Sequence, residues 1–298
     1  MRVLVTGSEG QLSRSLVERA AAHSRLSIQT TRRPDVDLAR PGCLSQAIER
    51  IRPDLVINAA AYTQVDQAES EPDLAFRINR DAAGEAAAAA FKIGAPIIQL
   101  STDYVFDGTS STPYREDDPT NPLNVYGASK LAGEEAVAKA NPDHLILRTS
   151  WVVSPFGTNF VKTMLRLATQ REEVAVVFDQ RGCPTSALDL ADAILDLAQR
   201  RYDGERAEWG RVVHLAGSDA CSRADFAIGI FSIGGPLGLP RATVNPISSS
   251  HLETAALRPS FSLLDCAAAA HDFGLRLPTW EAALPQILSA LVLGKGAD

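Results

Sequence analysis

Short hydrophobic runs with β propensity alternate with helical patterns along the first half of this chain. The first run, Val3-Leu4-Val5, leads into a glycine-containing turn that ends at Gly10. After the turn, hydrophobic positions recur with helical spacing, at Leu12, Leu16, Val17 and Ala20. Further strands are predicted at 27–31, 54–58 and 96–101, and an Ala-rich helix at about 73–91. This alternation predicts an α/β fold with a parallel, doubly wound sheet up to about residue 150.

The pattern is less regular in the second half. Helices are predicted at 159–169 and 188–200, and strands at 174–178 and 212–216. The helix at 188–200 is expected to pack back on the sheet. From Cys221 onward we expect a smaller capping lobe, in which the Gly- and Pro-rich stretch 234–240 is either a substrate loop or a surface turn.

Composition narrows the classes of protein that this chain can represent. It has 298 residues and a net charge of −7, which argues against a nucleic-acid-binding surface, since phosphate contacts require clustered Lys and Arg. The four cysteines form no C-x-x-C pair, and the chain starts in a strand with no run long enough to span a bilayer. These features predict a cytoplasmic protein with reduced thiols. The five histidines show no ligand spacing, so no zinc site is expected.

The glycine turn after the first strand is the first candidate for chemistry. A strand, a glycine turn and a helix bring backbone N–H groups and a helix N-terminus to a pyrophosphate. Gly7 is expected to allow the tight turn and Gly10 the close approach of the phosphates, with Gln11 and Leu12 completing the cradle. Ser13 stands where a third glycine is usual, so we expect slightly looser packing there. The segment predicts a dinucleotide site in a Rossmann-like domain.

The end of the second predicted strand bears on the choice of dinucleotide. Arg32 and Arg33 suit the 2′-phosphate of NADPH, whereas an acidic residue such as Asp37 usually holds the free ribose hydroxyl of NADH. Asp37 and Leu38 are candidates for the adenosine end, and Asp37 could instead cap a helix that begins near Pro41. We expect NADPH, with NADH still used.

Two further strand ends are expected to complete the pocket. Small residues after 54–58 let a cofactor lie against the strand, and the candidates there are Ala60, Ala61 and Thr63. The strand at 96–101 delivers Thr102 and Asp103 to its carboxyl end, where ligands bind in open α/β sheets. Asn79, inside the Ala-rich helix, is either structural or a brace for the active-site backbone.

A Tyr-x-x-x-Lys pair supplies candidate acid–base chemistry. Tyr126 and Lys130 are four residues apart in a predicted helix, so they share one helical face. A phenol titrates near 10, and a neighbouring cation is expected to lower the pKa of Tyr126 into a useful range. Thr102 is expected to offer a second hydroxyl to the same substrate oxygen.

The ordered set of motifs resembles the extended short-chain dehydrogenase/reductases, and among them the dTDP-4-dehydrorhamnose reductases. The motifs lie at 7–12, 58–61, 101–108, 126–130, 148–151, 159–165, 179–185 and 258–262. The chain departs from the usual pattern at three positions. Ser13 replaces a glycine, Tyr62 stands where a histidine is common, and Leu263 stands where a basic residue often follows the serine.

This resemblance implies a fold and a reaction. The fold is a dinucleotide-binding Rossmann domain over 1–150, with returning segments at about 174–217, and a substrate-binding lobe from 151–170 and 218–298. The reaction is NAD(P)H-dependent reduction of the 4-keto group of dTDP-4-dehydro-L-rhamnose to dTDP-L-rhamnose. Tyr126 would donate the proton, Lys130 would hold the nicotinamide ribose, and Asp103 and Trp151 would contact the sugar. A homodimer and a Mg²⁺ requirement stay open.

Two alternatives stay open. The first is another sugar-nucleotide epimerase or dehydratase of the same superfamily, although Tyr104 follows Thr102-Asp103, so the Asp-Glu pair common to dehydratases is missing. The second is a non-catalytic regulatory subunit such as the β subunit of methionine adenosyltransferase. The Thr102, Tyr126 and Lys130 set favours an enzyme.

Overall fold

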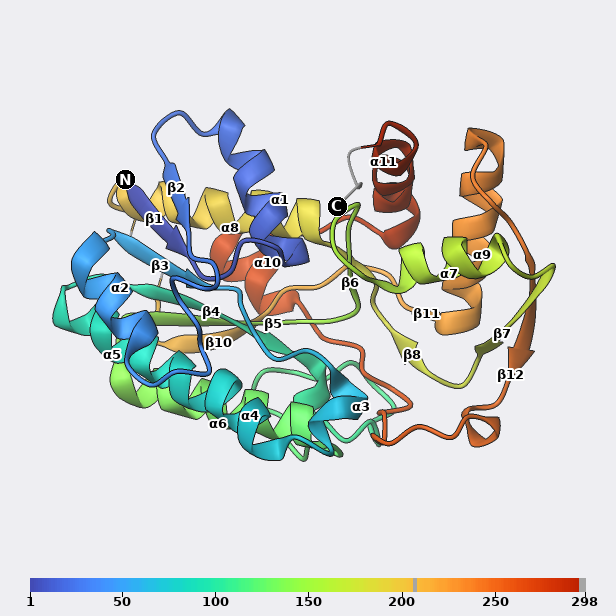
Figure 1. The fold of residues 1–298 in the computed structure, drawn as a ribbon, viewed down its shortest axis with the longest axis horizontal. Coiled ribbons are helices and arrows are strands. Elements are labelled where there is room, and N and C mark those ends of the chain that lie inside the picture. Colours follow the sequence, from blue (N-terminus) through green and yellow to red (C-terminus); the bar gives the residue numbers. More distant parts are fainter. Residues whose placement is uncertain (206–207, 295–298) are drawn as a thin grey trace.

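A six-stranded parallel sheet forms the centre of the computed structural model, which describes residues 1–205 and 208–294 (Figure 1). The strand order is β10-β5-β4-β3-β1-β2, and every pair is parallel. The bounds are β1 Arg2–Val5, β2 Ser27–Thr30, β3 Leu55–Asn58, β4 Ile97–Thr102, β5 His144–Thr149 and β10 Arg211–His214. The predicted doubly wound α/β sheet is confirmed, with strand ends within a residue or two of those expected.

Helices cover both faces of this sheet (Figure 1). One face is covered by α1 Gln11–Arg19, α8 Ala187–Tyr202 and α10 Ala267–Phe273; the other by α2 Cys43–Ile51, α5 Ala82–Lys92 and α6 Val125–Ala140. All residues of β3 and β4 are buried, as expected for strands enclosed on both faces. Alanines dominate the buried face of α5, and they allow α5 and α6 to approach closely.

The strand order reverses between β1 and β3. The chain leaves β1 for β2 on one side and later returns through β3 to build the rest of the sheet on the other side. In open α/β sheets a crevice forms at such a reversal, outside the carboxyl ends of the strands. The glycine turn after β1 and the small residues after β3 therefore lie side by side.

The Ala-rich helical stretch is interrupted by a π-helical turn. It consists of α4 Pro72–Phe76, the π turn Arg77–Asp81 and α5, and it is preceded by α3 Val65–Ala68. The prediction of a continuous helix over about 73–91 therefore missed a change of register at Asn79. Such turns often occur at functional sites.

A smaller part of the molecule has its own core beside the central sheet (Figure 1). Its helices are α7 Phe160–Ala168, α9 Arg223–Gly234 and α11 Trp280–Val292. Its two-stranded sheets pair β7 Glu173–Val177 with β12 Thr243–Ile247, β8 Arg181–Gly182 with β11 Cys221–Ser222, and β6 Val152–Val153 with β9 Thr185–Ser186. The Gly-rich stretch after α9 contains a short 3₁₀ helix at Gly235–Leu237.

The pairing differs from two details of the expected domain division. Strand β7 pairs with β12 and not with the central sheet, so the returning segment begins with α8 and not at 174. In addition, α10 packs on the central sheet although it falls in the expected lobe 218–298. Sequence pattern could not show either point, because a short strand or helix carries no signal for the sheet that it joins or covers.

Two kinds of feature are absent from the described residues. No helix among them is long and apolar enough to cross a membrane. Nor do they contain a group of three or more His, Cys, Asp or Glu side chains that could hold a metal ion.

Candidate active site

The glycine turn after β1 has the geometry of an open anion cradle. Gly7 has a φ of +80°, and a Cβ there would lie 3.2 Å from the Cβ of Ala60. Gly10 is the N-cap of α1 without a side-chain cap, and the first turn of α1 carries no acidic residue. Backbone N–H groups and the positive end of the helix dipole thus face the space above β1. Phosphate oxygens fit this cradle, which a side chain at Gly7 would narrow.

Ser13 lies at the helix–strand contact. It is buried, and its hydroxyl donates to the carbonyl oxygen of Thr6 at 3.2 Å. The hydroxyl is thus satisfied within the turn, and the slightly looser packing expected at Ser13 stays a prediction. The side chains of Gln11 and Leu12 also have structural roles. The Gln11 amide contacts Val152, Ser154 and Asn159, and Leu12 lies in the core.

Buried hydrogen bonds connect this turn to helix α6, which carries Tyr126 and Lys130. Thr6 donates to the Asn58 Oδ1 at 2.7 Å, and Asn58 donates to the Gln99 Oε1 at 2.7 Å. Gln99 in turn donates a hydrogen bond to the carbonyl oxygen of Leu100. The same oxygen accepts a hydrogen bond from the Lys130 ammonium at 2.5 Å. Gln99 could not be predicted from the sequence, since a single buried amide in a strand has no distinctive pattern.

Thr102 and Tyr126 meet at the carboxyl end of β4. Asn124 caps α6 by accepting a hydrogen bond from the Gly127 backbone at 2.8 Å. Gly127 lies so close to Tyr104 that a Cβ would be 2.1 Å from its carbonyl oxygen, and this contact places Tyr126 beside Thr102. The Thr102 hydroxyl is near enough to lower the pKa of Tyr126, against the larger effect of burial. Two hydroxyls thus converge on one point, where a carbonyl oxygen could be protonated.

The expected lowering of the Tyr126 pKa by Lys130 is not found. Burial raises the pKa of Tyr126 above its usual value of 10, and the charges of Asp103 and Tyr104 act in the same direction. Lys130 is not among the groups that lower it, because its ammonium is directed at the Leu100 carbonyl. Burial lowers the pKa of Lys130 to about 8, opposed by the carboxylate of Glu134. The helical spacing was interpreted correctly, but it could not give the direction of the ammonium.

A buried ion pair lies one turn beyond Lys130. Glu134 and Arg148 are each 5% exposed, and the Arg148 Nη2 lies 2.7 Å from the Glu134 Oε2. Glu134 also accepts a hydrogen bond from Ser101, and Arg148 approaches the Nε2 of His214 at 3.4 Å. Glu134 follows Lys130 by four residues, so the helical face was predictable from spacing, but its partner on β5 was not.

Asp103 lies beside Thr102 at the carboxyl end of β4. Asp103 is 2% exposed; its Oδ1 accepts a hydrogen bond from Thr102 at 3.1 Å, while its Oδ2 has no partner. Burial raises the pKa of Asp103 from 3.8 to about 6, against the smaller lowering effects of the nearby Ser262 and Thr102 hydroxyls. A buried carboxylate oxygen without a partner is costly, and a ligand hydroxyl would satisfy it.

Trp151 has an unusual backbone conformation. Its φ is +46°, in the left-handed region that non-glycine residues rarely adopt. Its ring lies against Gly182, where a Cβ would be 2.4 Å from the indole, and the Arg223 guanidinium carbon lies 3.5 Å from the ring centroid. Such strain is often found at ligand sites. Arg223 could not be predicted from the sequence, because it comes from α9 and reaches Trp151 only through the fold.

The residues expected at the adenosine end follow β2. Arg32 and Arg33 are exposed there. Asp37 accepts a hydrogen bond from the Ala39 backbone at 3.0 Å and lies 4.0 Å from the Arg40 guanidinium, so its carboxylate serves its own loop. The suggestion that Asp37 caps a helix near Pro41 is wrong, because α2 begins at Cys43 with Gly42 as its N-cap. Leu38 packs against the core on this side.

Asn79 braces the backbone after β3. Its side chain accepts a hydrogen bond from the Tyr62 N–H at 2.8 Å and donates to the Tyr62 carbonyl at 3.0 Å. It also donates to the Ser129 hydroxyl at 2.9 Å, on α6 between Tyr126 and Lys130. The structure thus favours the brace among the two roles expected for Asn79. In the segment after β3 that Asn79 holds, Ala60 and Ala61 are partly buried and Thr63 is exposed.

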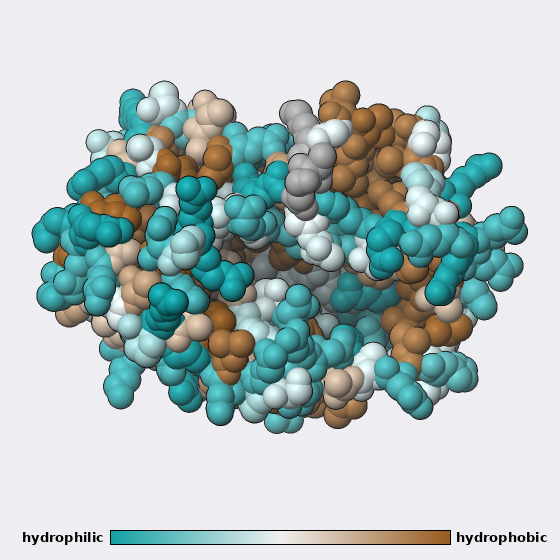
Figure 2. Space-filling view, in the orientation of Figure 1, coloured by the Kyte–Doolittle hydropathy of each residue, from teal (hydrophilic) through white to brown (hydrophobic). Residues whose placement is uncertain are grey.

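The carboxyl ends of β1, β3, β4 and β5 bring these groups to one region of the molecule. Figure 2 shows a hollow in the middle of this face, between the part built on the central sheet and the smaller part. A glycine cradle, a hydroxyl pair and a buried lysine at one sheet edge are the parts of a site for a dinucleotide and a carbonyl substrate.

Comparisons with known proteins agree with this geometry. Residues 1–293 match the family model described as RmlD substrate binding domain. A dTDP-4-dehydrorhamnose reductase of Sinorhizobium fredii (strain NBRC 101917 / NGR234) is 47% identical over 298 residues, which cover 100% of both chains. A crystal structure of a dTDP-4-dehydrorhamnose reductase from Clostridium acetobutylicum has a TM-score of 0.90 and 35% identity, over 98% of this chain and 99% of the other. The Bacillus anthracis reductase in complex with NADP has a TM-score of 0.89 and 37% identity, over 97% and 98%. The resemblance inferred from the motifs is confirmed, and the chain belongs to the RmlD family that includes these dTDP-4-dehydrorhamnose reductases.

Proposed function

We propose that this chain is an NADPH-dependent dTDP-4-dehydrorhamnose reductase, which reduces dTDP-4-dehydro-L-rhamnose to dTDP-L-rhamnose. The observation that carries the proposal is the hydroxyl pair Thr102–Tyr126 at the carboxyl end of β4, opposite the glycine cradle, in a chain of the reductase family. The NADP complex of a related reductase supports NADPH as the cofactor.

The cofactor fits the residues present. Gly7 to Leu12 would hold the pyrophosphate, and Arg32 and Arg33 the 2′-phosphate. Lys130 would hold the nicotinamide ribose, and Ala60, Ala61 and Thr63 would line the dinucleotide. When bound, the cofactor supplies the hydride that reduces the carbonyl carbon.

Tyr126 would act as the acid. A carbonyl oxygen placed between the two hydroxyls gains negative charge during reduction, and Tyr126 transfers its phenolic proton to that oxygen. The raised pKa keeps Tyr126 protonated at neutral pH, as a proton donor requires. Thr102 donates a hydrogen bond to the same oxygen and stabilises the developing charge. The proton on Tyr126 is then restored from solvent.

The substrate would lie between Asp103 and Trp151. The free Oδ2 of Asp103 would accept a sugar hydroxyl, and the indole of Trp151 would cover the ring. Arg223 stacks on Trp151 and faces Asp103, so it places a cation beside an anionic nucleotide sugar. The cofactor would then lie against the central sheet, and the sugar would lie against the smaller part that contains α7 and α9. The free cysteines fit a reducing compartment such as the cytoplasm.

The test is hydride transfer. Purified chain, NADPH and dTDP-4-dehydro-L-rhamnose should give dTDP-L-rhamnose with deuterium transferred from labelled NADPH, and Tyr126→Phe should lower turnover by about a hundred- to ten-thousand-fold. The Phe variant should still bind NADPH, since it loses only the transferable proton. Near wild-type turnover in Tyr126→Phe would exclude Tyr126 as the acid. Binding without any turnover in the wild-type chain would favour the regulatory-subunit alternative.

A further inference from the structure

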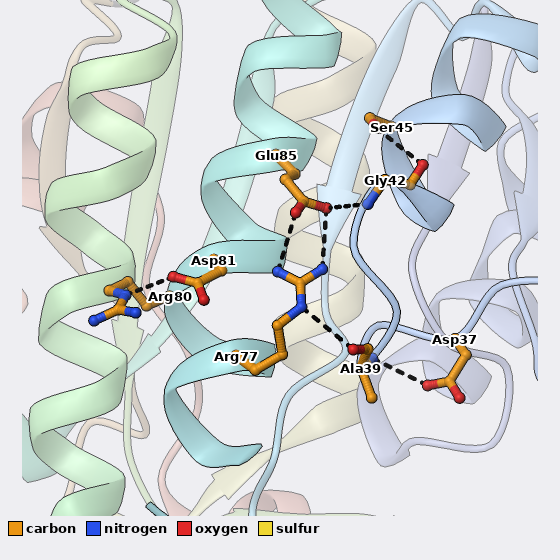
Figure 3. Close-up of polar contacts among 8 residues, drawn as sticks. All are labelled: Asp37, Ala39, Gly42, Ser45, Arg77, Arg80, Asp81 and Glu85. Carbon is orange, nitrogen blue, oxygen red and sulfur yellow. Dashed lines mark hydrogen bonds and ion pairs between the residues drawn. The ribbon is translucent and has the colours of Figure 1, made fainter. Parts of the chain in front are cut away.

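An ion pair outside the Thr102–Tyr126 site connects the loop 37–42, where the adenosine end is expected, to the π-helical turn. Arg77 and Glu85 are 15% and 28% exposed, and their side chains meet at 3.1 Å and 3.2 Å through two nitrogen–oxygen contacts. Figure 3 shows the Arg77 guanidinium lying between the Glu85 carboxylate and the loop that contains Ala39. Such a two-point contact fixes the orientation of both side chains.

Both partners hold the backbone of the loop 37–42. The Arg77 Nε donates to the Ala39 carbonyl at 3.4 Å, and the Glu85 Oε2 accepts the Gly42 N–H at 3.1 Å (Figure 3). The Gly42 φ is +75°, so this N–H is directed by a turn that glycine favours. The loop is thus held near its middle and at its end by groups that lie outside it.

The π turn makes this pair possible. Arg77 and Glu85 are eight residues apart, and in an undistorted α-helix their side chains would point about 80° away from each other. One extra residue in the π turn brings them to the same side. The same turn directs Asn79 toward Tyr62 and Ser129, next to the hydroxyl site. One helical turn therefore positions both ends of the region where a dinucleotide would lie.

We propose that Arg77 and Glu85 are positioning residues for the cofactor, which hold the loop 37–42 in the shape that receives the adenosine end. This inference rests on the proposed NADPH function. Preformed loops bind better because less ordering is needed on binding. Loss of the pair should therefore weaken cofactor binding and leave the chemistry of the bound complex nearly unchanged.

The test uses Arg77→Gln and the matched control Arg80→Gln. Arg80 pairs with Asp81 in the same turn, but on an exposed side that points away from the loop (Figure 3). For Arg77→Gln we expect the Kd values for NADPH, NADH and 2′,5′-ADP to rise by about tenfold each, and kcat at saturating NADPH to stay within about twofold. Arg80→Gln should change none of these values.

Two further variants separate the positioning of the loop from direct contact with the 2′-phosphate. Arg32→Ser with Arg33→Ser should weaken NADPH and 2′,5′-ADP but not NADH, whereas Arg77→Gln weakens all three. Glu85→Gln keeps an acceptor for the Gly42 N–H, so its effect should be smaller, at about threefold. It also provides a second measurement if Arg77→Gln does not fold.

Each outcome decides between the proposals. The wild-type chain should bind 2′,5′-ADP. If Arg77→Gln and Glu85→Gln both bind it equally well, the positioning role is overturned but the proposed function is not. A fall in kcat as large as the loss of binding would also overturn it, because the pair would then act on the catalytic helix. A wild-type chain that binds neither NADPH nor 2′,5′-ADP would instead remove the proposed function, and this inference with it.

Discussion

At the scale of single residues, Asp103 combines a cost in stability with its proposed contact to the sugar. Its carboxyl group is buried with one oxygen unpartnered, and its pKa is raised by burial to about 6. The ordinary value is 3.8, so above pH 6 the folded state carries a charge that the unfolded state accommodates more easily. This cost is relieved as the pH falls through 6 and is absent below 3.8.

Asp103→Asn should therefore stabilise the protein while lowering its activity. Removal of the buried charge is expected to raise the free energy of unfolding at pH 8 by about 1–3 kcal/mol, and the gain should vanish near pH 4. Denaturant titrations at both pH values measure the difference. Asp107→Asn is the control from the same loop and should destabilise the protein, because hydrogen bonds from Thr109 lower the pKa of Asp107 to about 2. A gain for Asp103→Asn that persists at pH 4 would contradict an electrostatic cause.

Lys130 is expected to make cofactor binding depend on pH. Burial lowers the pKa of Lys130 to about 8, so its ammonium is lost as the pH rises through that value. The KM for NADPH should rise over the same range in the wild-type chain, since the ribose loses a charged donor. In Lys130→Met the KM should be about tenfold higher at pH 7 and independent of pH from about 7 to 9. A pH dependence that survives in Lys130→Met would assign the titration to another group.

At the scale of elements, the position of α6 depends on close backbone contacts. A Cβ at Gly133 would lie 2.1 Å from the Asn79 carbonyl oxygen in the π turn. Backbone cannot move aside as a flexible side chain can, so the contact fixes α6 against the π turn. The same contact keeps Tyr126 and Lys130 in place relative to the segment after β3.

Gly133→Ala should consequently cost about 1–3 kcal/mol of stability, as expected for overpacking, and also lower kcat. Gly84→Ala is a graded control on the neighbouring helix, where the nearest contact of a Cβ is 3.2 Å from the Ala136 side chain. Its effect should be small, because alanine also favours the helix. Thermal unfolding and steady-state turnover of both variants measure the difference; equal stability of the two would show that α6 can shift freely.

At the scale of the whole molecule, His214 connects β10 to the buried Glu134–Arg148 ion pair. Its Nδ1 donates to the Tyr114 carbonyl at 3.0 Å, and its Nε2 faces the Arg148 guanidinium at 3.4 Å. The ring is therefore neutral, with the second nitrogen as acceptor. Burial and Arg148 lower the pKa of His214 from 6.5 to about 4, partly opposed by hydrogen bonds with the backbone of Tyr114 and Asp265.

The protein should lose stability on mild acidification through His214. Between pH 6.5 and 4 the unfolded chain binds a proton that the folded chain does not, so up to about 3 kcal/mol is lost over this window and nothing more below it. His214→Asn keeps a donor for the Tyr114 carbonyl and should be less sensitive to pH over this range. His251→Asn, at an exposed position, should behave like the wild-type chain. Identical pH profiles for the wild-type chain and His214→Asn would exclude His214 as the cause.

Local patterns in the sequence are sufficient for the features that depend on neighbours along the chain. Strand and helix periodicity predicted the parallel sheet and its strand ends, and the spacing of Tyr126 and Lys130 predicted their common helical face. The order of the motifs indicated the family. These features are local because hydrophobic period, glycine turns and helical spacing act within a few residues.

Interactions between distant segments depend on the folded chain instead. Burial, and not Lys130, sets the pKa of Tyr126. The partner of Glu134 is on β5, Arg223 reaches Trp151 from α9, and β7 joins β12 rather than the central sheet. The π turn that carries Arg77 and Asn79 packs closely against Gly133 of α6. Desolvation and long-range pairing depend on the complete three-dimensional surroundings, which sequence spacing does not contain.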